Sequence, residues 1–148
     1  MSKMGCIQQN PDAIEDLLQT VINRLSSHAL RLAIWVVEDI DLSQFDAQRI
    51  GAESPFIDSD SILAGSGYLI LVGSSNIKSI IEVLSGDLIN EIIHIEIESN
   101  KEVEFAAFDF FEYIYFGKQI SVEILEDLKS HNVILSYDLF NAEVSEKE

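Results

Sequence analysis

Residues 91–105 of the sequence read EIIHIEIESNKEVEF and bring together side chains that could bind a cation or a basic group. The candidates are one histidine and four glutamates: His94, Glu96, Glu98, Glu102 and Glu104. Carboxylates pair with lysine and arginine, and carboxylate oxygens and imidazole nitrogens are also ligands of divalent metals. The stretch is therefore the first candidate binding site.

The alternation of residues 93–98 predicts how these side chains are arranged. Isoleucines alternate with His94, Glu96 and Glu98, which is typical of a strand with one buried and one solvated face. A three-residue loop at 99–101 would return the chain as a second strand. The predicted cross-strand pairs are Ile97–Val103, Ile95–Phe105 and Ile93–Ala107 on the buried face, and Glu98–Glu102, Glu96–Glu104 and His94–Ala106 on the open face. A shift of one residue would turn glutamates into the core, so this register is expected.

Three interpretations of such a hairpin remain open. Like charges opposite each other destabilise a strand pair by up to about 1 kcal/mol, so nothing in the fold itself calls for them. They could be the solvated face of an acidic protein. They could be a negative surface that receives lysine and arginine from a partner. A divalent-metal site would use His94, Glu96 and a facing carboxylate.

A second acidic concentration follows the apolar run at residues 30–37. It contains Glu38, Asp39, Asp41 and Asp46. Ligands of open α/β sheets often bind beyond the carboxyl ends of strands. The segment is interpreted either as a solvated loop or as part of the same surface for a basic partner.

The aromatic stretch at residues 105–116 supplies another candidate interface. It contains Tyr113 and Tyr115, and such side chains are frequent anchors of protein interfaces when they are not core residues. Almost no basic residue flanks the stretch, so it does not resemble a platform for stacking nucleic-acid bases. Asp109 is expected to cap a helix in the second half of the stretch.

The charge of the whole chain points to the class of partner. The 148 residues include 26 acidic and 9 basic ones, which gives a formal net charge of −17. Solubility alone needs a charge of roughly 2–8 in magnitude in a small domain. Nucleic acid and anionic membranes are bound mainly through lysine and arginine, so the composition argues against both and favours a basic protein partner.

The order of apolar and polar segments predicts the elements that would carry these residues. Helices are expected to begin at Asn10, near residue 75 and at Ser121, and strands at 30–37, 67–73, 88–98 and 133–137. Residues 38–67 form a long excursion, and the termini, about 1–9 and 141–148, are expected to be flexible. The strand–helix–strand spacing from residue 67 to 98 favours a parallel crossover. The predicted fold is a single α/β domain over residues 1–148, with α+β as the alternative. It has a mixed sheet of about five strands with three to four helices packed on it.

Other features assign no chemistry. Cys6 is the single cysteine, so no internal disulfide can form. The first residues contain no apolar stretch of the kind a signal peptide needs, and no apolar run approaches the length of a membrane span, so a cytoplasmic location is expected. The sequence DSDS at 58–61 lacks the glycine and glutamate that a calcium loop needs at its sixth and twelfth positions. No phosphate-binding loop or nucleophile turn appears. The sequence therefore assigns no catalytic residue, metal ligand or cofactor, and it gives no indication of oligomeric state.

In size, charge and expected compartment the chain resembles bacterial immunity proteins, which are paired with secreted toxins. Inhibitors that mimic the charge of DNA share this profile. The resemblance implies a non-enzymatic protein that neutralises a basic partner, such as a toxic nuclease. The alternative is a small metal- or ligand-binding enzyme that uses the acidic residues of 38–46 or 94–104.

Overall fold

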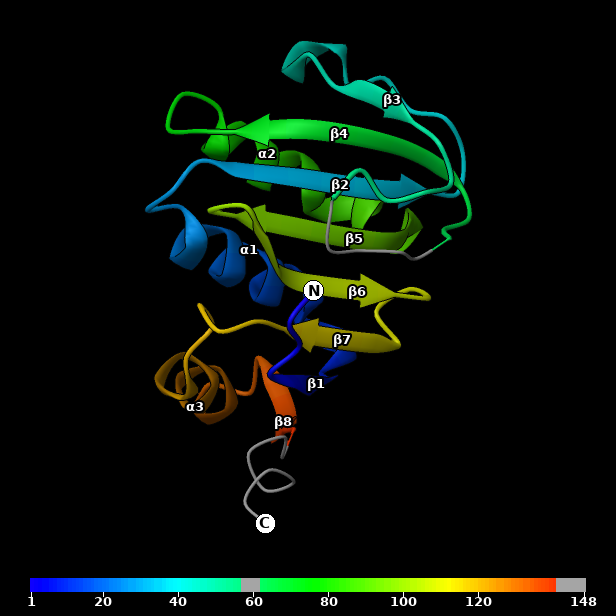
Figure 1. Cartoon of the computed structure of the whole chain (residues 1–148). Coiled ribbons are helices and arrows are strands. Elements are labelled where there is room, and N and C mark those ends of the chain that lie inside the picture. Colours follow the sequence, from blue (N-terminus) through cyan, green and yellow to red (C-terminus); the bar gives the residue numbers. More distant parts are fainter. Residues whose placement is uncertain (57–61, 141–148) are drawn as a thin grey trace.

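Eight strands form one continuous sheet in the computed structural model, which describes residues 1–56 and 62–140 (Figure 1). The strands are β1 (Gly5–Gln9), β2 (Leu30–Val36), β3 (Gln48–Ile50), β4 (Ser66–Val72), β5 (Ile92–Ser99), β6 (Glu102–Phe108), β7 (Tyr113–Phe116) and β8 (Ile134–Leu139). Their order across the sheet is β3-β4-β2-β5-β6-β7-β1-β8. Every neighbouring pair is antiparallel.

Three α-helices cross one face of this sheet. They are α1 (Ile14–Leu25), α2 (Ile77–Leu84) and α3 (Val122–Ser130), and three short 3-10 helices accompany them: η1 (Pro11–Ala13), η2 (Ser43–Phe45) and η3 (Gly86–Glu91). Each α-helix joins two strands that run in the same direction and are separated by other strands: α1 joins β1 to β2, α2 joins β4 to β5, and α3 joins β7 to β8. The helices therefore tie distant parts of the sheet together.

The start of α1 follows directly from the sequence. Asn10 accepts a hydrogen bond from the amide of Asp12, and Pro11 opens η1, which leads into the helix. The stripe of α1 that includes Leu18 and Ile22 is buried, as its 3.6-residue spacing predicts. The predicted first helix is confirmed.

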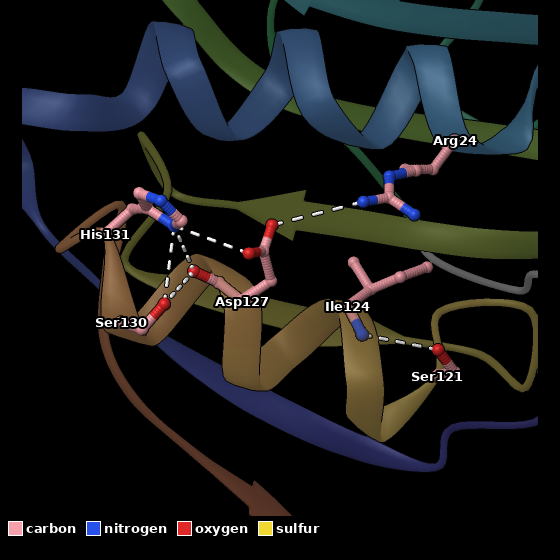
Figure 2. A network of polar contacts seen from close by, with 6 residues as sticks. All are labelled: Arg24, Ser121, Ile124, Asp127, Ser130 and His131. Carbon is pink, nitrogen blue, oxygen red and sulfur yellow. Dashed lines mark hydrogen bonds and ion pairs between the residues drawn. The ribbon is translucent and has the colours of Figure 1, made fainter.

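Helix α3 is also capped as predicted, and it is linked to α1 through exposed polar groups (Figure 2). Ser121 Oγ accepts a hydrogen bond from the amide of Ile124. At the other end, His131 Nδ1 lies 2.9 Å from the carbonyl oxygen of Asp127, and the carboxylate of Asp127 lies 4.0 Å from Arg24. These contacts are exposed, so they fix helix ends more than they add stability.

The core lies on both faces of β2. The helix-facing side joins residues of all three α-helices to strand residues in one apolar cluster. The other side, here called the second face, holds Trp35 in a smaller cluster beneath the β3–β4 connection, where Phe56 and Leu63 cover it. Trp35 Nε1 donates to the carbonyl oxygen of Gly51 at 3.0 Å, which fastens this cover. The predicted strand at 30–37 is confirmed as β2, which ends at Val36 and is covered on both faces.

The predicted α/β arrangement with a mixed sheet of about five strands is wrong, and the α+β alternative describes the fold. Strands β4 and β5 do run in the same direction, but β2 lies between them and pairs with both in antiparallel fashion. A strand that is apolar on both faces can occupy the centre of either kind of sheet. Its sequence therefore did not reveal which strands would lie beside it.

Two local predictions are also wrong. Residues 5–9 are not a flexible terminus, because β1 lies between β7 and β8 in the sheet. No helix forms after Asp109, since residues 113–116 continue as strand β7. The excursion 38–67 contains η2 and β3, while its residues 57–61, including the rejected calcium loop, and the tail 141–148 lie outside the described residues.

Within residues 1–56 and 62–140, no helix is long and apolar enough to cross a membrane.

Candidate functional site

The glutamate hairpin has a different register from the predicted one. Its turn is two residues long, and Asn100 and Lys101 both adopt left-handed backbone angles, with φ of 54° and 72°. This geometry suits a tight hairpin whose twist matches that of its strands. Ile97 therefore pairs with Phe105 instead of Val103. Glu104 is left as the extra residue of a β-bulge, so the predicted pairing of glutamates with glutamates is wrong.

Glu98 is neutralised within the protein. Arg31, from the neighbouring strand β2, donates two hydrogen bonds to its carboxylate, at 2.6 Å and 2.9 Å. The hydrogen bond to Glu98 raises the pKa of Arg31 above its ordinary value. The guanidinium also lies 5.1 Å from the centre of the Phe56 ring. Glu98 thus helps to fasten the cover of the second face.

Glu96 and Glu104 are buried, each with 1% of its surface exposed. Ser54, in the cover, donates a hydrogen bond to Glu96 at 2.5 Å. Glu104 accepts hydrogen bonds from the backbone and side-chain nitrogens of Gln119, at 2.9 Å and 3.3 Å. Burial raises the pKa of Glu104. The prediction that the four glutamates form an open patch is wrong, and of the four only Glu102, 3.7 Å from Lys118, has a substantially exposed side chain.

His94 supports a turn. Its ring is buried beside that of Phe108, with 5.7 Å between ring centres, and its Nδ1 accepts a hydrogen bond of 3.2 Å from the amide of Asp109. Burial lowers the pKa of His94. Glu96 lies further along the same strand. No group of three or more histidines, cysteines or acidic residues arranged to hold a metal occurs among the residues that the structure describes.

The acidic segment that follows β2 is at the surface. Glu38, Asp39 and Asp41 are all exposed. Asp39 accepts a hydrogen bond from Ser66 and lies 3.5 Å from Arg49. Asp41 accepts hydrogen bonds from the hydroxyl and the amide of Ser43, and these lower its pKa. These carboxylates are positioned where a partner could reach them.

The two predicted tyrosines lie on β7 and line a hollow of about 430 Å³ on the second face. Tyr113 is 52% exposed. Tyr115 is partly covered, and the ammonium group of Lys3 lies 4.1 Å from the centre of its ring. An ammonium group packed on an aromatic face is a favourable contact. This surface therefore already accepts one basic side chain.

Antiparallel pairing gathers several acidic connections at one end of the sheet. Val36, the last residue of β2, pairs with the start of β5, and Phe108, the last of β6, pairs with Tyr113. The chain leaves β2 and β6 and enters β4, β5 and β7 at this end, which is the right-hand end of the sheet in Figure 1. We call it the acidic end. Its exposed carboxylates are Asp12, Glu15, Asp16, Glu38, Asp39, Glu91, Asp109 and Glu112.

The opposite end of the sheet carries most of the described basic residues. We call it the hairpin end, since it contains the turn between β5 and β6. Its basic residues are Arg24, Arg31, Lys78, Lys101 and Lys118. Three others lie elsewhere: Lys3 at Tyr115, Arg49 beside Asp39, and Lys129 in the last turn of α3. At the hairpin end these basic residues offset carboxylates such as Glu98 and Glu102, whereas few basic residues offset the carboxylates of the acidic end.

A second hollow, of about 480 Å³, opens at the acidic end on the side of the helices. It lies among the start of α1, η3 and the turn between β6 and β7. Asp12, Glu15 and Asp16 line it together with Phe110 and Phe111. Residues from the turn therefore border hollows on both faces of the sheet, because Asp109 and Tyr113 line the hollow on the second face.

Sequence reasoning did not group Asp109, Glu112 and the acidic residues of α1. They are far apart in the chain, and only the strand order brings them to one end. The sequence did contain an indication of this grouping. If residues 102–108 and 113–116 are two strands joined by a short turn, the turn with Asp109 and Glu112 lies at the end of the sheet at which β2 finishes.

Comparisons with known proteins give no assignment: no family model, no curated protein and no solved structure matches the chain.

Proposed function

We propose that this chain is a non-enzymatic binding protein that neutralises a basic partner protein through its acidic end. The observation that supports this is the separation of charge along the sheet. Exposed carboxylates from four separate segments lie at the acidic end, while five of the described basic residues lie at the other. Mere solubility would be served equally well by evenly distributed charge.

Charge separation would act before contact. A positively charged partner is attracted more strongly to the acidic end than to the hairpin end, where basic side chains offset the nearby carboxylates, so it arrives already oriented. Such steering raises association rates by orders of magnitude at low salt and fades as salt increases. A basic partner would then meet Glu38 and Asp39 on one side of the acidic end and Tyr113 on the other, with Asp41 exposed further along the segment that follows β2.

The most concrete form of this function is that of an immunity or inhibitor protein against a toxin such as a nuclease. An enzyme that grips nucleic acid presents lysine and arginine to phosphates, and a negative protein surface can occupy the same groove. Tyr115, which already packs against Lys3, stays within the proposed partner-binding set. Glu102 is removed from that set because it lies at the hairpin end, 3.7 Å from Lys118. Glu96 and Glu104 are removed from the set because they are buried. Glu98 is removed because its carboxylate is paired with Arg31.

The proposal is tested by affinity capture from the native host, with this chain as bait and washes of increasing salt. In parallel, the gene immediately upstream is co-expressed, with an inactivating mutation if its product is toxic. A single basic protein retained in a stoichiometric complex and released by salt is the expected result. It should be lost when Asp109 and Glu112 are both replaced by lysine. Retention of no basic protein even at low salt would contradict the proposal.

A further inference from the structure

The turn between β6 and β7 has an unusual backbone. Asp109, Phe110 and Phe111 are three consecutive residues in the left-handed region, with φ of 54°, 57° and 68°. This backbone region is unfavourable for residues other than glycine, and more so for phenylalanine than for aspartate. Backbone strain of this kind persists only where the surroundings impose it, and it is concentrated at functional sites.

Four hydrogen bonds impose this conformation. The amide of Asp109 donates to His94 Nδ1 at 3.2 Å, and the amide of Phe110 donates to the carbonyl oxygen of Ile93 at 2.9 Å. The amide of Glu112 donates to the carbonyl oxygen of Asp109 at 3.1 Å, which closes the turn. Gln9, on β1, donates its side-chain amide to the carbonyl oxygen of Phe111 at 3.2 Å. The turn is thus held from both β5 and β1.

The turn separates two adjacent phenylalanines. Phe111 is directed into the core and is 4% exposed, whereas Phe110 is 51% exposed. Burying Phe111 anchors the turn, and the fixed backbone then presents the ring of Phe110 to solvent. The exposed carboxylates Asp109 and Glu112 lie on either side. An aromatic ring held rigidly among unburied charges is the usual composition of an interface anchor.

We propose that residues 109–112 are the anchor on which the basic partner docks. Phe110 inserts into an apolar depression of the partner, and the surrounding carboxylates contact lysines and arginines at its rim. This inference rests on the proposed function and adds the point of contact. Charge complementarity favours a basic partner over a second copy of the chain at this site. A second copy, with its own net charge of −17, would be repelled at the acidic end.

The rigidity of the turn bears on affinity. A side chain that is already ordered loses little conformational freedom on binding, so more of its contact energy appears in the measured affinity. Removing a central aromatic anchor typically weakens a complex by tenfold or more. We expect at least about that loss for Phe110→Ala.

Two synthetic peptides of equal length and equal positive charge test the inference. One alternates lysine and arginine with leucine, and the other carries serine in place of each leucine. Binding to the full chain is measured by titration, together with amide chemical shifts. The native chain should prefer the leucine peptide, and the largest shifts should fall at residues 109–113. Phe110→Ala should remove the preference while leaving binding of the serine peptide unchanged.

Leu71→Ala is the control, since Leu71 is also an exposed large apolar residue but lies near the end of β4, at the opposite end of the sheet. It should bind both peptides as the native chain does. Phe110→Asn guards against misfolding, because asparagine adopts left-handed angles readily, and it should lose the preference as alanine does. Equal affinity of native and Phe110→Ala chains for the leucine peptide would overturn the anchor while the proposed function stands. If the native chain binds neither peptide at low salt, the proposed function fails and the anchor fails with it.

Discussion

Replacing Glu98 by glutamine should lower the free energy of unfolding by about 2 kcal/mol. The carboxylate accepts two hydrogen bonds from Arg31, and a hydrogen bond to a charged group contributes about 1.5–3 kcal/mol. Arg31 is 39% exposed, so solvent screens part of this, and glutamine keeps one acceptor. The remaining loss is about a thirtyfold change in the folding equilibrium.

A double-mutant cycle in urea isolates the pair. The cycle compares Glu98→Gln, Arg31→Met and the variant with both changes, and it should give a coupling energy of about 1–2 kcal/mol. The same cycle on Glu102 and Lys118 is the matched control. That pair is 3.7 Å apart and mostly exposed, so its coupling should stay below about 0.5 kcal/mol. Equal coupling in the two cycles would refute the assignment of Glu98 to structure rather than to a partner.

Three further predictions concern single sites. Burial raises the pKa of Glu104. The protonated side chain therefore contributes its full stabilisation below the unfolded carboxyl pKa of about 4.3, and this stabilisation is lost as the pH rises through the higher pKa of the folded state. Glu104→Gln should flatten this decline of the free energy of unfolding, which denaturant titrations at several pH values would measure. Burial lowers the pKa of His94. The neutral ring therefore contributes its full stabilisation of the fold above the unfolded histidine pKa of about 6.5, and this stabilisation is lost as the pH falls through the lower pKa of the folded state. NMR titration should report His94 protonation together with shifts of the Asp109 amide, and independent titration of the two would contradict the hydrogen bond. Lys101→Gly should raise the free energy of unfolding by about 1 kcal/mol, because glycine tolerates the left-handed angle at that position, whereas Ser2→Gly, outside the strands, should change little.

The elements were largely predictable from local pattern, and the sheet was not. The stripe of α1, the cap at Ser121 and the apolar run of β2 each depend on neighbouring residues in the sequence, and each was found. The order of the strands depends on which edges meet in three dimensions. The antiparallel insertion of β2 between β4 and β5 has no local signature.

The hairpin shows how a reasonable rule gave a wrong site. Alternation alone allowed a three-residue loop, and it left every glutamate on an open face. The two-residue turn at Asn100 and Lys101 and the bulge at Glu104 changed both results. The predicted burial of β2 on both faces indicated that a neighbouring strand would also be covered. Glu96 pairs with Ala33 of β2 and is buried under the same cover.

The central claim, that the acidic end receives a basic partner, is tested most directly by a matched pair of charge reversals. Glu112→Lys lies at the acidic end and Glu102→Lys lies in the hairpin at the other end, and both change the net charge by the same amount. Affinity for the leucine-containing basic peptide is measured over a range of salt concentrations. Glu112→Lys should weaken binding and reduce its salt dependence, while Glu102→Lys should stay close to the native chain. Equal loss in the two variants would contradict the claim, since only the total charge would then matter.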